Sequence, residues 1–174
     1  MTAPATEIPY KAREGKVHLV EVPPANFLMV DGRGDPNTAQ AYKDAVGALY
    51  TLSCALKFAL KKNGVEHKVG PLEGLWWVED LSETAYDELM RRKDEWHWRL
   101  MIAQPEAVTP ERFEPVREAV RRKKNPTGLD RVRRERFHEG LSAQTLHVGP
   151  FAAEGPTVAF LHEAISATGV YHAR

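Results

Sequence analysis

A single glutamate interrupts an apolar segment that also carries two tryptophans. Glu73 stands between Leu72 and Gly74, three residues before the pair Trp76-Trp77. Burial of a carboxylate without a partner is costly, so Glu73 should pair with a cation, face a wet cleft or bind a ligand. In an aromatic cleft, Glu73 could bind a cationic group or act as the catalytic base on water. The alternative is a structural salt bridge to a neighbour such as Arg99.

The spacing around Glu73 predicts which side chains accompany it. Residues 68–78 have the pattern of a strand, in which successive side chains alternate between two faces. Glu73, Leu75 and Trp77 then share one face, and Leu72, Trp76 and Val78 share the other. Trp77 is therefore the best candidate to stack on a planar or cationic ligand, while Trp76 belongs to the core.

Other aromatic and histidine side chains are candidates for the same site. Trp98 shares a face with Trp96 in a second alternating segment, and the pattern leaves open whether that face lines a cleft or meets the helices. Tyr50 could reach a cleft from the first helix, although amphipathic packing explains it equally. His147 and Phe151 flank a Gly-Pro turn and could line the opposite wall. The candidate ligand-binding residues are thus Glu73, Trp77, Trp98, Tyr50, His147 and Phe151.

The elements that must position these residues follow from hydrophobic periodicity. Apolar residues at 45, 49, 52, 56 and 60 predict a helix over 38–63, with Asn37 or Thr38 as its cap. Strands are expected at 17–22, 27–30 and 96–102, and helices at 82–92, at 109–124 and from Gly155 onward. Residues 131–137 and 142–148 could form a hairpin about Glu139-Gly140. Together these elements predict an α+β fold.

Composition narrows the class of protein. The chain has 174 residues, 24 basic and 24 acidic side chains and one cysteine. This length suits one domain, and the balanced charge gives no field that would attract nucleic acid or an anionic membrane. A local basic surplus at 112–136 lacks interleaved aromatics and is interpreted as a solvated face. The seven histidines lack metal-ligand spacing, so we expect no metal and no cofactor. Without a signal peptide or an apolar stretch of about 18 residues, we expect a cytoplasmic protein.

The sequence indicates a single domain over 1–174 that contains an internal repeat of one structural unit. Repeat one spans about 17–104 and repeat two about 140–174, each with a strand, a glycine-containing turn, a helix and a further glycine. If the two parts are repeats, we expect repeat two to lack most of its closing strand. The alternative is that the halves are unrelated. Residues 1–16 are small and polar, which is typical of a flexible arm.

Four segments resemble the GyrI-like small-molecule-binding proteins, in the stand-alone branch related to bacterial effector-binding domains. They are MVDGRGDPN (29–37), VGPLEGLWW (69–77), WHWRLMIAQP (96–105) and QTLHVGPFAAEGPT (144–157). The resemblance implies two pseudo-symmetric strand–helix–strand–strand units. These form a curved antiparallel sheet with helices on one face and a ligand cleft on the other. Family members usually continue into a further strand whose carboxylate faces the cleft.

The resemblance also implies a function. Members bind hydrophobic, planar or cationic small molecules, in some cases several drugs, and a subset hydrolyses electrophilic compounds that carry a cyclopropane ring. We therefore expect binding of such a molecule in an aromatic cleft that contains Glu73. The alternative is a hydrolase in which Glu73 assists attack by water, and a third reading is a protein whose cleft receives another chain. Whether the chain forms a homodimer is left open.

Overall fold

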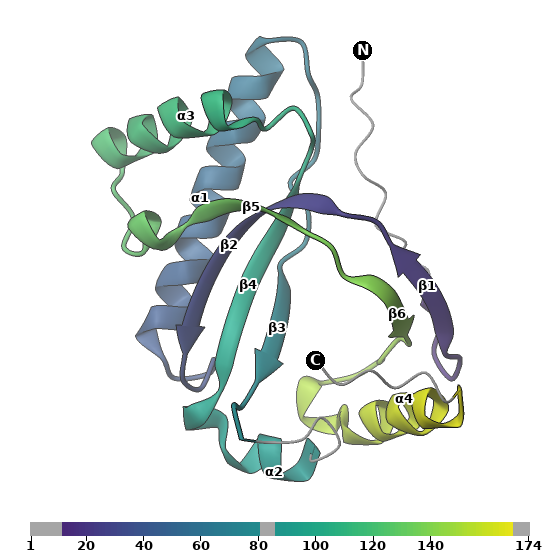
Figure 1. Ribbon diagram of the computed structural model, residues 1–174. Helices are drawn as coiled ribbons and strands as arrows, with labels where there is room; N and C mark the ends of the chain where they lie inside the picture. The colour runs from purple at the N-terminus through teal and green to yellow at the C-terminus, as the bar shows by residue number, and fades with distance from the viewer. Residues whose placement is uncertain (1–11, 81–85, 169–174) are drawn as a thin grey trace.

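The protein is an α+β structure built from two antiparallel sheets and flanking helices, as the sequence predicts. The computed structural model describes residues 12–80 and 86–168. A four-stranded sheet has the order β3-β4-β2-β5, and a separate two-stranded ribbon pairs β1 with β6 (Figure 1). The strands are β1 (His18–Val22), β2 (Ala25–Arg33), β3 (Glu73–Trp77), β4 (His97–Gln104), β5 (Arg133–Phe137) and β6 (Gly140–Gln144). The helices in the described part are α1 (Gln40–Lys62), α2 (Tyr86–Arg91), α3 (Pro110–Lys123) and α4 (Gly155–Thr168).

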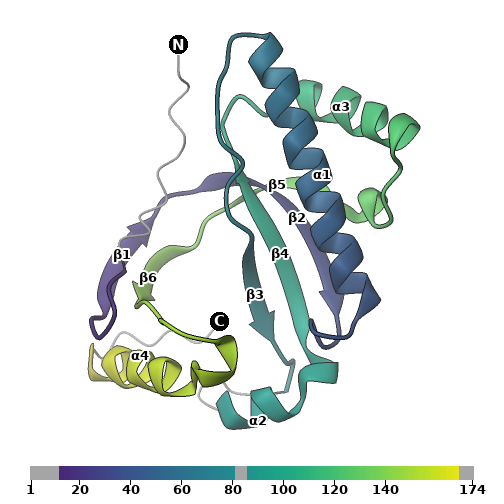
Figure 2. The ribbon, with the colours of Figure 1, turned by 180° about the vertical axis from the view of Figure 1, so that it is seen from behind.

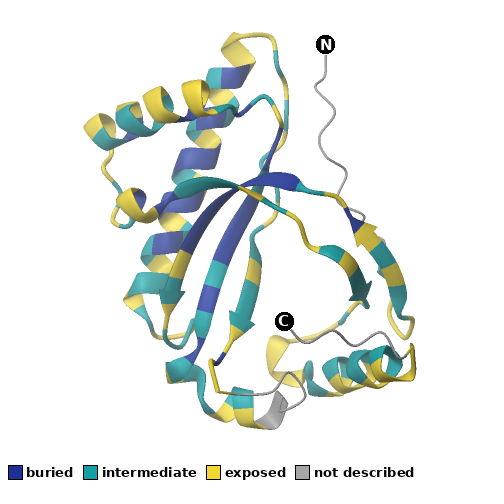
Figure 3. Ribbon diagram, viewed as in Figure 1, coloured by how far each residue is buried: buried dark blue, intermediate teal, exposed yellow. Residues whose placement is uncertain are grey.

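Helix α1 covers one face of the four-stranded sheet, and this layer contains the main core. Figure 2 shows α1 lying across β2 and β4, with α3 beside it. The predicted periodicity is confirmed, because the buried face of α1 carries Ala45, Leu49, Leu52, Leu56 and Leu60. They pack against the side chains that β2 and β4 turn toward the helix, namely Leu28, Val30, Trp98, Leu100 and Ile102. These strands and the inner side of α1 form the buried interior of Figure 3.

The start of α1 differs from the prediction. The N-cap position is Ala39, and no side chain caps it. The Asp35 carboxylate instead accepts a hydrogen bond from the Asn37 backbone N–H at 2.8 Å. The backbone carbonyl of Asp35 accepts from Thr38 and Ala39. The Asp35-Pro36 turn therefore organises the helix entry, and Asn37 and Thr38 belong to that turn.

Two strands bend and continue from one sheet into the other. The chain passes from β1 to β2 through Pro23-Pro24, and from β5 to β6 through His138-Glu139. The predicted hairpin is wrong, because β5 pairs with β2 and β6 pairs with β1. Proline has no N–H to donate to a ladder, so the β1–β2 strand stops pairing and turns at the two prolines. Gly140, with φ +76°, allows the partner strand to turn at the same level.

The remaining elements are shorter than the sequence predicts or partly outside the described residues. The strand expected at 68–78 is ordered as a strand only over Glu73–Trp77, and β6 ends at Gln144 rather than at 148. Helix α4 lies beside α2 and β6 (Figure 1), and none of its described residues is fully buried. Residues 1–11 of the expected arm and 169–174 of the expected second repeat lie outside the described residues. No helix in the described ranges is long and apolar enough to cross a bilayer.

Candidate small-molecule site

The face of the sheet opposite α1 carries Glu73. Cross-strand pairing sets Glu73 opposite Met101, Leu75 opposite Arg99 and Trp77 opposite His97. The predicted alternation along β3 is confirmed, because Trp76 points to the helix side. There its ring lies 5.8 Å from Tyr42 and 5.4 Å from Trp96. Helices α1 and α3 thus lie on the side of the sheet opposite the Glu73 face, whereas α4 packs beside the ribbon, so the expectation that all helices cover one face is wrong for α4.

A cavity of about 230 Å³ lies between this face and the β1–β6 ribbon. One wall is formed by β3 and β4, and the other by the ribbon. The sheet wall carries one polar side chain, whereas three of the six lining residues of the ribbon wall are polar. The lining residues are Val20, Val22, Glu73, Gly74, Leu75, Met101, Glu139, Ser142, Ala143 and Gln144.

Glu73 is the polar residue that the sheet contributes to this cavity. Its Oε1 atom is shielded from solvent. The expected alternative, a salt bridge to Arg99, competes with another carboxylate: Arg99 Nε donates to Asp31 Oδ1 at 2.7 Å. Partial burial by itself would raise the pKa of Asp31, but hydrogen bonds from Arg99 and Arg133 lower it below its usual value. Arg99 is thus committed to Asp31.

Glu139 is a second carboxylate that lines the cavity, and the sequence pattern did not predict it. Glu139 precedes Gly140 at the corner where β5 turns into β6. The sequence predicts a hairpin turn about Glu139-Gly140, and a hairpin turn would place Glu139 at the tip of the hairpin, away from the sheet. The bend instead brings it to the side of the ribbon that faces β3. Only the long-range pairing of β1 with β6 and of β2 with β5 reveals this, so no local signal could have identified it.

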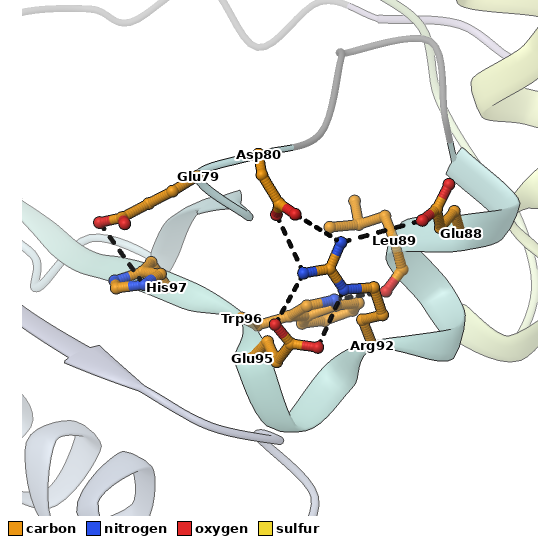
Figure 4. Close-up of polar contacts among 8 residues, drawn as sticks. All are labelled: Glu79, Asp80, Glu88, Leu89, Arg92, Glu95, Trp96 and His97. Atoms are coloured by element: carbon orange, nitrogen blue, oxygen red, sulfur yellow. Dashed lines mark hydrogen bonds and ion pairs between the residues drawn. The ribbon is translucent and has the colours of Figure 1, made fainter.

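Trp77 lies further along the Glu73 face, where β3 ends. Its side chain is 39% exposed. The ring stacks on His97, with centroids 5.7 Å apart and an interplanar angle of 23°. His97 Nε2 lies 3.8 Å from a Glu79 carboxylate oxygen (Figure 4). Trp77 therefore presents an aromatic surface on the same face as Glu73, although it does not line the 230 Å³ cavity.

A second, charged cavity of about 200 Å³ adjoins His97. Arg92 lines this cavity and forms ion pairs with Asp80 at 2.9 Å, Glu95 at 2.7 Å and Glu88 at 3.8 Å (Figure 4). Hydrogen bonds from Arg92 lower the pKa of Asp80 and of Glu95. The guanidinium is thus already occupied by carboxylates, and it fastens the end of β3 to the segment that follows α2.

Two of the predicted ligand-binding residues lie on the helix side of the sheet. Trp98 is fully buried, and its ring meets that of Tyr42 edge-on at 5.5 Å. Trp98 shares its face with Leu100 and Ile102, so it belongs to the core beneath α1. Tyr50 is 38% exposed on α1 itself. Neither residue lines the cavity that contains Glu73.

The remaining two predicted residues lie between β6 and α4. His147 uses both ring nitrogens within this segment: Nδ1 lies 3.0 Å from Thr157 Oγ1, and Nε2 lies 3.1 Å from the Pro150 carbonyl oxygen. Phe151 is 84% exposed. The structure places neither of them in the lining of the cavity. Of the six predicted residues, Glu73 alone lines it, with Trp77 nearby on the same face.

Comparison with solved structures reveals close relatives from Listeria innocua. The crystal structure of a hydrolase shares 34% sequence identity at a TM-score of 0.77, covering 92% of this chain and 80% of that chain. An uncharacterized conserved protein shares 36% identity at a TM-score of 0.83, covering 94% and 79%. The chain belongs to the family of these proteins. A further hydrolase of this family shares 36% identity at a TM-score of 0.80, covering 94% and 78%. No family model and no curated protein matches the chain.

Proposed function

We propose that this protein is a small-molecule hydrolase, in which Glu73 activates water inside the cavity between the ribbon and the sheet. The observation that carries the proposal is the placement of the Glu73 carboxylate among apolar residues in the sheet wall of the cavity, with Oε1 shielded from solvent. A carboxylate in such surroundings is suited to act as a general base. The two relatives that are named hydrolases support the same reaction class.

The substrate that we propose is an electrophile that carries a cyclopropane ring, in keeping with the resemblance to GyrI-like proteins. Drug-sized ligands occupy pockets of about 300–1,000 Å³, and this cavity holds about 230 Å³. It therefore suits the compact reactive end of a molecule. A planar remainder would extend along the face toward Trp77, whose ring is exposed and stacked on His97.

The reaction at Glu73 is an addition of water with ring opening. Glu73 accepts a proton from water, and the water oxygen bonds to a ring carbon of the cyclopropane. The carbon–carbon bond at that position breaks, and its electron pair moves into the conjugated system of the substrate. A proton then neutralises the acceptor atom, so that the product equals the substrate plus one water molecule.

A spirocyclopropyl cyclohexadienone tests this proposal directly, because ring opening converts its dienone chromophore into a phenol. We expect the native protein to turn over an excess of this compound. Glu73→Gln should lower kcat by at least about a hundredfold, the lower end of the contribution of a general base. The matched control is Glu66→Gln, since Glu66 is exposed and forms an ion pair with Lys61 at 3.7 Å. Equal rates for Glu73→Gln and Glu66→Gln would refute a catalytic role for Glu73.

The second candidate function is binding of a planar cation without turnover, and the exposed Trp77 favours it. Aromatic faces attract cations, and Glu73 supplies a negative charge on the same side of the sheet. We expect ethidium to quench tryptophan fluorescence saturably. Trp77→Leu and Glu73→Gln should each weaken binding about tenfold, or about 1.4 kcal/mol. Tyr50→Leu, on the opposite side of the sheet, serves as the control. Equal affinities for all variants would place the dye elsewhere.

A further inference from the structure

His18 carries a buried ring nitrogen that engages no partner in the described part of the chain. Its Nε2 atom is shielded from solvent and has no hydrogen-bond partner among the described residues. Two other histidines differ, since both ring nitrogens of His147 are engaged and His138 lies 3.5 Å from Glu21, whereas Nδ1 of His67 is also shielded and unpartnered among the described residues. Leaving a buried polar atom without a hydrogen-bond partner destabilises the folded state, so such an atom requires an explanation, of which a missing ligand is one.

The pairing of the ribbon shows which way His18 faces. Side chains at 18, 20 and 22 share one face of β1, and both Val20 and Val22 line the cavity. His18 pairs with Gln144 in the same register that pairs Val20 with Ser142, and Gln144 and Ser142 also line the cavity. His18 therefore lies one step further along the inner face of the ribbon, across from the sheet that carries Glu73.

A second unsatisfied atom belongs to the residue that follows the pairing partner of His18 in the chain. Thr145 directly follows Gln144, and its Oγ1 is likewise shielded from solvent and without a hydrogen-bond partner in the described part of the chain. Neither His18 nor Thr145 is among the residues that line the 230 Å³ cavity, but His18 lies next to Val20 on the inner face of the ribbon, while the sheet wall offers a carboxylate. A bound molecule that extends past Val20 and directs a polar oxygen toward His18 would satisfy its ring nitrogen.

We propose that His18 is the proton donor of this site, an inference that rests on the proposed hydrolase function. In the reaction of the dienone, Glu73 takes a proton from water as the water oxygen bonds to the ring CH₂ group. The cyclopropane carbon–carbon bond breaks, and its electron pair passes through the ring to the carbonyl oxygen. Nε2 of the protonated His18 ring donates its proton to that oxygen. Transfer of the proton from Glu73 through solvent to His18 restores both groups.

The test compares His18→Ala with His138→Ala, whose histidine is exposed and pairs with Glu21 on the outer side of the ribbon. We expect His18→Ala to lower kcat for the spirocyclopropyl cyclohexadienone at least tenfold, with a KM changed less than threefold, and added imidazole to restore part of the rate. His138→Ala should match the native protein. His18→Gln keeps a polar side chain but carries no transferable proton, so its kcat should fall as far as that of His18→Ala. This second variant also serves if His18→Ala fails to fold.

The outcomes separate this inference from the function on which it rests. Turnover that depends on Glu73 but is unchanged in His18→Ala and His18→Gln would overturn the role of His18 and leave the hydrolase intact. A loss that imidazole does not restore in a folded His18→Ala variant would do the same. If the native protein turns over none of the compound, the proposed hydrolase function is refuted. Contact between His18 and a bound molecule is then tested by the imidazole ¹⁵N resonances as ethidium is added to saturation. Unmoved His18 signals would then overturn the contact, and a shift confined to His18 would support it.

Discussion

Gly32 illustrates how one missing side chain fixes the core beneath α1. It lies in β2 opposite Trp98 in the sheet register. A Cβ atom at position 32 would come within 2.1 Å of Cη2 of Trp98. Because the indole is fully buried and in contact with Tyr42, the ring has no room to retreat. The requirement for glycine here is one of space, not of backbone conformation.

We therefore expect Gly32→Ala to destabilise the protein by about 3 kcal/mol, the upper end of the usual cost of overpacking. The matched control is Gly47→Ala in α1, where an added Cβ would meet nothing within 4 Å. That change should stabilise the helix by up to about 1 kcal/mol. Urea denaturation midpoints measure both effects. A Gly32→Ala variant as stable as the native protein would show that Trp98 can shift.

At single positions, the sequence predicts side-chain faces only relative to one another. The alternation in β3 correctly separated Glu73 and Trp77 from Trp76. It could not decide which face of β4 meets the helices, and so Trp98 stayed a ligand-binding candidate although it lies in the core. The absolute direction depends on where α1 packs, which is a tertiary contact that no local pattern encodes.

Among the elements, Asp31 ties three strands together on the cavity side of the sheet. Asp31 belongs to β2 and binds Arg99 of β4 at 2.7 Å and Arg133 of β5 at 3.0 Å. Arg133 also binds Glu135 at 2.7 Å. The pair of guanidinium groups lowers the pKa of Asp31 against the opposing effect of its partial burial.

This cluster should make stability depend on pH in a defined direction. Because the folded-state pKa of Asp31 is lowered, its contribution is complete above the usual carboxyl value of 3.8 and disappears as the pH falls below it. We expect Asp31→Asn to lower the free energy of unfolding by about 1 kcal/mol at pH 7, a modest amount because Asp31 is half exposed. Well below pH 3.8, the variant and the native protein should be equally stable. Denaturation curves from pH 2 to 7 measure this. A difference that does not change over the range would mean that the ion pairs contribute nothing.

The element boundaries show where local signals succeed and fail. The helix of 23 residues and the strand β4 were predicted because hydrophobic periodicity persists over their length. The hairpin at Glu139-Gly140 was wrong because a glycine with positive φ suits both a turn and a bend in a continuing strand. Choosing between a turn and a bend requires knowing that β5 pairs with β2 and that β6 pairs with β1. The place of Glu139 in the cavity depends on this same choice.

At the scale of the molecule, the two sheets differ in how firmly they are held. All residues of β2 from Ala25 to Val30 are buried, whereas in the ribbon only Val22 is. Segments with few buried apolar contacts open at lower free energy than the core. The ribbon wall, which carries Val20 and Ser142, is thus the more easily opened side of the cavity.

Native-state hydrogen exchange should therefore reveal a sub-global opening of the ribbon. We expect the amides of β1 and β6 to exchange at least tenfold faster than those in the centre of β2 and β4, where Leu28 pairs with Ile102. A ligand in the cavity should slow exchange in the ribbon more than in the sheet. Uniform protection across both sheets would instead describe a single cooperative unit.

The corner between the sheets also constrains how the chain can vary in evolution. Val22 pairs with Gly140 and Ala25 pairs with Phe137, so Pro23-Pro24 in one strand is matched in length by His138-Glu139 in the other. An insertion of one residue on one side alone would slip the register and turn Val20 away from the cavity. Insertions and deletions at these two distant places should therefore occur together among homologues, each gain on one side accompanied by an equal gain on the other.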